Sequence, residues 1–89
     1  MNEKEVITSA IRVFGEEKQE LKAIEELSEL ITAISHKHFN REHNIAEEIA
    51  DVEIMLEQLK IINNCASDVE EIRKQKLVRL NDKVFDMCL

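Results

Sequence analysis

The chain of 89 residues contains one glycine and no proline, and this scarcity of backbone breakers constrains its fold more than any other feature. β-Sheets depend on turns, which are rich in glycine, proline, asparagine and aspartate. The apolar residues recur three and four positions apart, which is the period of an α-helix. No alternating polar and apolar run indicates a strand. We therefore expect an all-α fold.

Four helical segments follow from this period and from residues that favour helix ends. Asn2 is the expected N-cap of the first segment and Asn44 that of the third, because an asparagine side chain can accept a hydrogen bond from the first helical turn. Gly15 is a natural break between the first two segments. The connections are short, which favours a single domain built as an antiparallel bundle of about four helices. The predicted segments are residues 3–14, 16–38, 44–62 and from about 68 onward.

Apolar stripes predict which side of each helix faces the core. The third segment is apolar on nearly every side, which is typical of a buried helix. A chain of this size buries only about 60–65% of its unfolded surface. We therefore expect oligomerisation to complete the bundle. The predicted stripe of the second segment is Leu21, Ile24, Leu27, Ile31 and Ile34.

Charge and composition argue against two classes of partner. The chain has 19 Asp and Glu against 12 Lys and Arg, a formal net charge of −7, and its only aromatic residues are three phenylalanines. Nucleic-acid binding requires basic patches for phosphates and aromatic platforms for unstacked bases. No apolar run approaches the roughly 20 residues that span a bilayer. We therefore expect no nucleic-acid partner and no membrane partner.

Two further features favour a cytoplasmic location. Residues 1–10 include three charges and lack the apolar centre of a secretory signal. Cys65 and Cys88 are far apart and fit no metal-binding or redox spacing. Structural disulfides are rare in cytosolic proteins, so we interpret both residues as small apolar side chains.

Most acidic residues fit solvated helix faces, but two clusters do not. The first comprises Glu25, Glu26 and Glu29, which lie three and four positions apart and so share one side of a helix. The second comprises Glu48 and Asp51. Glu48 occupies a core position in the apolar stripe of the third segment, and Asp51 lies beside it. The spacing therefore predicts carboxylates that face an interior.

A divalent cation is the simplest way to tolerate such an arrangement. A buried carboxylate costs several kcal/mol unless it is paired, protonated or bound to metal. In the third segment the only basic residue is Lys60, which lies on another side. Mg²⁺ prefers oxygen ligands and retains some of its water, so it suits a nest of carboxylates. Exposure of all these acids to solvent is the competing interpretation.

Other catalytic and metal-binding patterns are weaker. His36, His38 and His43 have no nearby cysteine partners, and we interpret them as complements to the negative end of the second helix. The sequence contains no glycine-rich phosphate loop and no nucleophile elbow. Nucleophilic catalysis therefore has no candidate residues.

The two acidic clusters resemble a known family signature. Residues 25–29 (Glu-Glu-Leu-Ser-Glu) followed by residues 48–51 (Glu-Ile-Ala-Asp) are similar to the EExxE…ExxD pattern of MazG-like, all-α nucleoside triphosphate pyrophosphohydrolases. The resemblance extends over roughly residues 16–83. It implies Mg²⁺-dependent cleavage of a nucleoside triphosphate between its α and β phosphates, which yields the monophosphate and pyrophosphate.

The resemblance also implies roles for nine residues. Four would bind Mg²⁺, and a fifth would be an additional ligand or would position the attacking water. Two basic residues of the last helix would contact phosphates, and two residues of the second helix would line the nucleotide pocket. Homo-oligomers are implied as well, as dimers or tetramers with the pocket near the subunit contact. The Mg²⁺ ligands would be Glu26, Glu29, Glu48 and Asp51, and the fifth residue would be Glu25. The residues that contact phosphates would be Lys76 and Arg79, and those that line the nucleotide pocket would be Gln19 and Lys22.

The alternative to an enzyme is a protein that only binds partners. In that case the chain is a non-enzymatic helical bundle, an adaptor or regulatory oligomer whose acidic surface docks basic partners. That function predicts no response to Mg²⁺ and no nucleotide hydrolysis, whereas the enzyme predicts both.

Overall fold

The computed structural model describes residues 1–88, and every regular element in that range is an α-helix. The all-α prediction with four helices is therefore confirmed. The last helix begins before its predicted caps, Ser67 and Asp68. No helix among the described residues is long and apolar enough to cross a membrane. The helices are α1 (Glu3–Phe14), α2 (Glu16–His38), α3 (Ile45–Ile62) and α4 (Ala66–Cys88).

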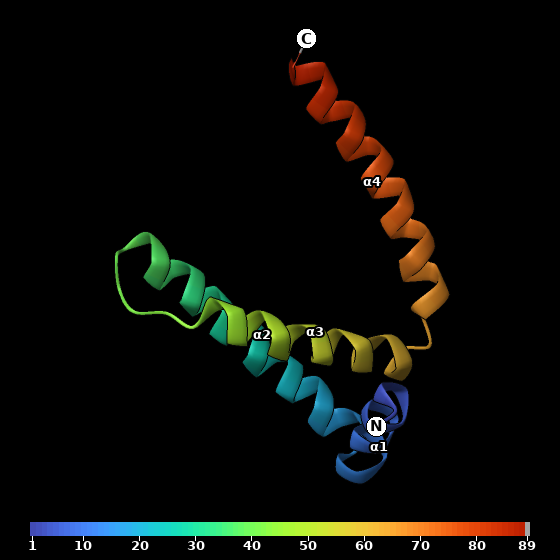
Figure 1. Cartoon of the computed structure of the whole chain (residues 1–89). Coiled ribbons are helices and arrows are strands. Elements are labelled where there is room, and N and C mark those ends of the chain that lie inside the picture. Colours follow the sequence, from blue (N-terminus) through green and yellow to red (C-terminus); the bar gives the residue numbers. More distant parts are fainter. Residues whose placement is uncertain (89) are drawn as a thin grey trace.

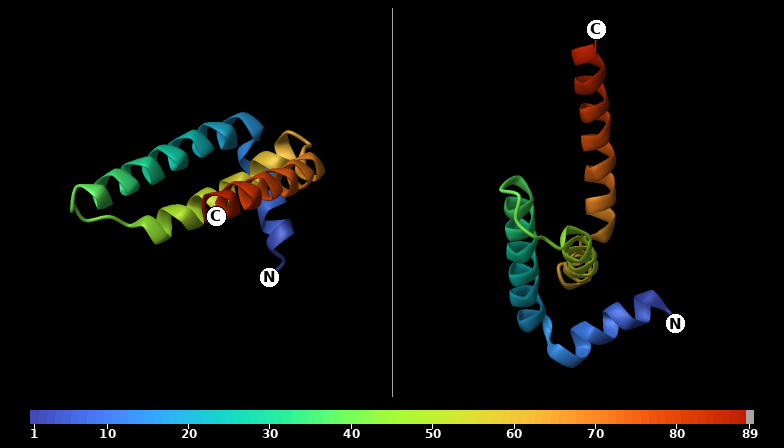
Figure 2. Two further views of the ribbon diagram at one scale, coloured as in Figure 1. Left: turned by 90° about the horizontal axis from the view of Figure 1, so that it is seen from above. Right: turned by 60° about the vertical axis from the view of Figure 1, so that its left-hand side comes forward.

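The predicted cap and break around α1 are confirmed. The side-chain oxygen of Asn2 accepts a hydrogen bond from the backbone N–H of Glu5 at 3.2 Å. Gly15 has a φ of 91° and a ψ of 150°, a conformation that is strained for residues with a Cβ atom. Its N–H donates to the carbonyl of Ile11 at 2.8 Å. This glycine produces the sharp turn between α1 and α2 (Figure 2).

α2 and α3 form the centre of the fold. They lie side by side as an antiparallel pair joined by the loop of residues 39–44, and α1 packs across the end opposite this loop (Figure 1). Val52 and Met55, which belong to the same apolar stripe of α3 as Glu48, are buried, so the inward side predicted from that stripe is confirmed. The remaining buried apolar side chains are Ile7, Ala23 and Ala33.

The predicted core face of α2 is wrong. Leu21, Ile24 and Ile31 are 60%, 61% and 68% exposed. The buried positions of α2 are alanines, one glutamine and one glutamate. Two alanines allow the backbone of α2 to approach α3 closely, whereas the bulky stripe stays exposed among the described residues. The buried positions are Gln19, Ala23, Glu26 and Ala33.

α4 extends away from the helical pair (Figures 1 and 2). Among residues 1–88 it contacts only α3, to which it is joined through Asn63–Cys65. Most of its described apolar side chains are exposed, including Leu77, Leu80 and Phe85. One chain leaves several apolar sides of α3 uncovered, since Ile49, Ile54, Leu56 and Ile61 are between 41% and 50% exposed, and their burial by oligomerisation stays a prediction. Cys65 has a free, half-buried thiol, and the side chain of Cys88 lies outside the described part.

Candidate metal centre

Three carboxylates converge where α2 and α3 pack together. Glu26 and Glu29 lie three positions apart on α2, and Glu48 reaches them from the start of α3. Each offers one oxygen, and the three oxygens lie within 4.8 Å of one another. We call this group the acidic triad. It contains three of the four residues predicted as Mg²⁺ ligands.

Burial separates two members of this triad from an ordinary acidic surface, whereas Glu29 is exposed. Glu26 is only 8% exposed, and its Oε2 atom is buried without a hydrogen-bond partner. Glu48 is half-buried, and its Oε2 atom is likewise without a partner. Buried polar atoms almost always have partners, so two orphaned oxygens in one cluster require an explanation. A hard cation bound among them would supply it.

The electrostatics of the site reflect crowding of negative charge. The pKa of Glu29 is raised above its ordinary value of 4.5, chiefly because the negative charge of Glu26 lies nearby. Partial burial and the charge of Glu48 act in the same direction. The triad therefore favours any species that removes negative charge, whether a proton or a metal ion.

Lys22 provides a positive charge at one side of the triad. Its Nζ atom lies 3.2 Å from Oε1 of Glu26 and 3.6 Å from Oε2 of Glu25. The pKa of Lys22 is raised above 10.5, first by its hydrogen bond to Glu26 and then by the charge of Glu25. This ion pair uses one oxygen of Glu26 and leaves the other orphaned.

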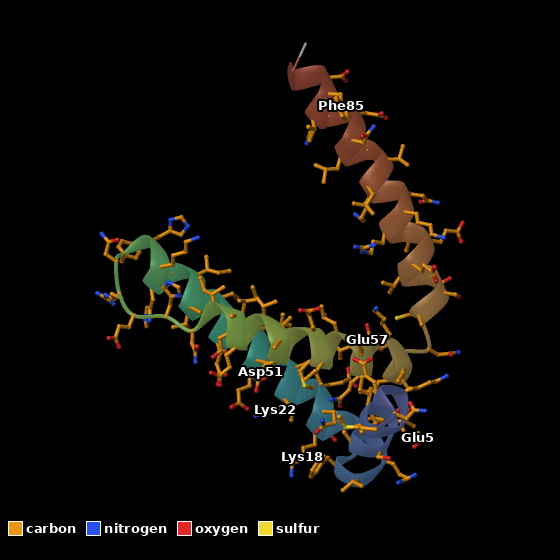
Figure 3. The ribbon with its side chains drawn as sticks, viewed as in Figure 1. Glu5, Lys18, Lys22, Asp51, Glu57 and Phe85 are labelled. Carbon is orange, nitrogen blue, oxygen red and sulfur yellow. The ribbon has the colours of Figure 1, made fainter. Side chains whose placement is uncertain are left out.

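The other predicted acidic residues lie beside the triad. Asp51 is half-buried on α3, three positions after Glu48, and is not one of the three residues whose oxygens converge. Figure 3 shows it on the stretch of the helical pair that also carries Lys22. Glu25 is exposed and paired with Lys22. Asp51 as a ligand and Glu25 as a water-positioning residue therefore stay predictions.

The predicted substrate-binding residues have different surroundings. Gln19 is buried, and its amide Nε2 donates to Oε1 of Gln58 at 2.8 Å. Gln58, 3% exposed, was not predicted, although its position three residues after Met55, beside the apolar stripe of α3, was a signal for it. Lys76 and Arg79 lie on α4, where they line hollows formed by α4 residues alone.

A cavity of about 490 Å³ adjoins the triad on its loop side. Glu29 and Glu48 belong to both the triad and the cavity wall. This cavity was not predicted, although Glu29, Ala33 and His36, which line it, follow Glu26 at helical spacing. Apart from the two glutamates, its polar lining includes Thr32, His36, Glu42, His43 and Asn44.

One hydrogen bond shapes the wall of this cavity. Nδ1 of His36 lies 3.2 Å from the backbone carbonyl of Glu42. A carbonyl can only accept, so this ring nitrogen is the donor and carries the proton. The contact holds the loop of residues 39–44 against the end of α2.

Comparisons with known proteins leave the site to be interpreted from its own geometry. No protein-family model, no curated protein and no solved structure matches the chain. The strongest functional pointer is therefore the donor set itself. Three carboxylates, two of them with orphaned oxygens, fit a divalent cation such as Mg²⁺.

Proposed function

We propose that the protein is a Mg²⁺-dependent nucleoside triphosphate pyrophosphohydrolase of the MazG-like, all-α type. The observation that supports this most is the buried, unpartnered Oε2 atom of Glu26 within a group of three carboxylates. Such an arrangement is unfavourable in a metal-free protein. It is favourable when a cation completes the site.

The residues of the site suit phosphoryl transfer. When bound, Mg²⁺ supplies neutralisation of phosphate charge and acidification of a coordinated water. Glu26, Glu29 and Glu48 would hold it, with Asp51 as the further ligand that the resemblance implies. Glu25 lies next to Lys22 and would orient the attacking water and accept its proton. Cleavage between the α and β phosphates yields the monophosphate and pyrophosphate.

Self-association is the second part of the proposal. The exposed stripe of α2 and the apolar residues of α4 would bury each other between copies, as a dimer or a tetramer. Within one chain, Lys76 and Arg79 lie on the helix that leaves the α2–α3 pair. A second copy could bring these cations to the phosphates. A cytoplasmic location, expected from the cysteine usage, fits an enzyme of nucleotide pools.

Pyrophosphate release from a panel of canonical and modified NTPs and dNTPs, with Mg²⁺, tests the activity. We expect release from at least one nucleotide, and we expect Glu48→Gln to abolish it. Glu53→Gln is the matched control, because Glu53 is exposed on the same helix and lies outside the triad. Absence of release from every nucleotide would refute the proposal and favour the adaptor. Equal turnover by Glu48→Gln and wild type would refute the role of the triad.

The oligomeric state is measured separately by sedimentation equilibrium. We expect wild type to sediment as a dimer or tetramer and Leu80→Glu, on the exposed face of α4, to sediment as a smaller species. Asn81→Glu introduces the same charge at the neighbouring position and should keep the wild-type mass. A monomeric wild type would contradict self-association and leave the metal site unaffected.

A further inference from the structure

The acidic triad lies between two chemically different regions along α2. Lys22 precedes Glu29 by seven residues and His36 follows it by seven, so each lies about 10 Å from Glu29 along the helix axis. Lys22 contributes a cation on one side. The histidine-containing cavity opens on the other side, towards the loop of residues 39–44.

The cavity suits a neutral group better than a polyphosphate. None of the described residues that line it is a lysine or arginine, and three of them are glutamates. Negatively charged phosphates would be repelled there without a cation. Its volume of about 490 Å³ lies within the range of roughly 300–1,000 Å³ that is usual for small-molecule pockets.

Two side chains of the cavity offer hydrogen bonds to a nucleoside. The hydroxyl of Thr32 donates to the carbonyl of Ser28 at 3.1 Å and so keeps its acceptor lone pairs. Asn44 precedes α3 as Asn2 precedes α1. Unlike Asn2, Asn44 makes no side-chain bond to the backbone of its helix. Its amide instead donates to Glu47, which leaves its oxygen able to accept from a ligand.

We infer that the nucleoside of the substrate occupies this cavity and that its triphosphate runs along the helical pair towards Lys22. The inference rests on the proposed function. The nucleoside then lies against Thr32 and Asn44, and the β and γ phosphates extend past Glu26. We call this direction of binding along α2 the polarity of the substrate. With this polarity the bond between the α and β phosphates falls at the acidic triad. The cleaved bond is thus explained by the order of the residues along α2.

Kinetics with and without a nucleoside test this polarity. The substrates are the nucleotide that wild type hydrolyses best and methyl triphosphate, in which a methyl group replaces the nucleoside. We expect Thr32→Val and Asn44→Ala to lower kcat/KM for the nucleotide about tenfold, mainly by raising KM. The same variants should change kcat/KM for methyl triphosphate less than about twofold. Thr32→Ser keeps the hydroxyl and should retain wild-type values. Lys22→Gln should lower kcat/KM for both substrates alike.

The outcomes separate this inference from the proposed function. If wild type hydrolyses nucleotides but the cavity variants affect both substrates equally, or neither, the polarity is wrong and the activity stands. If wild type hydrolyses nothing, the activity fails, and calorimetry with an α,β-methylene nucleotide and Mg²⁺ decides the polarity. Weaker binding by Thr32→Val, with Thr32→Ser unchanged, would support it. Absence of binding to wild type would overturn it. Circular dichroism melts identify any variant that fails to fold.

Discussion

Replacing Glu48 by glutamine removes one negative charge from the acidic triad and keeps the size of the side chain. In wild type, its carboxylate oxygen lies within 4.8 Å of oxygens of Glu26 and Glu29. Two unit charges at that separation repel by roughly 3.5 kcal/mol at an effective dielectric constant of about 20. Glu29 is exposed, so water and salt screen most of its share of this repulsion.

The substitution also removes a favourable interaction. Glu48 lies in the first turn of α3, where an anion gains about 0.3–1 kcal/mol from the helix dipole. The ion pair with Lys22 already offsets much of the charge of Glu26, so the net effect in metal-free protein is a gain in stability on the order of 1 kcal/mol, and for a domain of this size each 1 kcal/mol raises Tm by about 4–8 °C. At a Mg²⁺ concentration of about 100 Kd, wild type gains about 2.7 kcal/mol. The variant, with an incomplete ligand set, gains much less.

Thermal unfolding by circular dichroism, once in EDTA and once in excess Mg²⁺, therefore gives a crossing pattern. Glu48→Gln should melt above wild type in EDTA and below it in Mg²⁺. Glu47→Gln carries the same charge change at an exposed position of the same turn. It should melt slightly below wild type in EDTA and keep the full Mg²⁺ shift.

A single result would refute this reasoning. If Glu48→Gln melts below wild type in EDTA and shows the same Mg²⁺ shift as Glu47→Gln, the carboxylates neither repel one another in the metal-free fold nor share a cation.

Two further predictions concern protons and buried amides. Because the folded-state pKa of Glu29 is raised, its charge destabilises the metal-free fold at pH values above that pKa, and the effect disappears as the pH falls towards 4.5. The Mg²⁺-induced rise in Tm should decline over the same window; a pH-independent rise down to pH 4.5 would contradict this. Gln19→Met leaves Gln58 without its donor in a buried site, and urea unfolding should show a loss of about 1–3 kcal/mol. Gln19→Met/Gln58→Met should recover most of it, and additive losses would exclude a shared hydrogen bond.

The helices and the acidic triad could be predicted because both depend on local pattern. Asn2 and Gly15 act through their immediate neighbours, so the ends of α1 followed from the sequence. Glu26 and Glu29 share a helix face whatever surrounds them. Glu48 stands in line with Val52, whose burial is confirmed.

The packing face of α2 could not be predicted in the same way. Hydrophobicity favoured the stripe that contains Ile24 and Ile31, but the structure packs α2 through Ala23 and Ala33. The choice of face depends on how closely a partner helix can approach, which periodicity alone does not report.

The cavity depends on the loop between α2 and α3. Asn40 adopts a φ of 56°, in the left-handed region. This turn brings Glu42 back to His36. Such a conformation follows from the closure of the α2–α3 pair, and the composition of the loop did not reveal it.

The two buried alanines of α2 have a consequence for ion selectivity. Ala23 and Ala33 lie before and after Glu26 and Glu29 along α2. Because their side chains are small, they determine the distance between the axes of α2 and α3. The distance between the opposing carboxylates depends on this spacing, so in the proposed metal site the radius of the preferred ion would depend on two methyl groups outside the ligand set. Enlarging either alanine would increase the distance between the carboxylates. The ion preference of the proposed metal site would then move from small cations such as magnesium towards larger ones such as calcium.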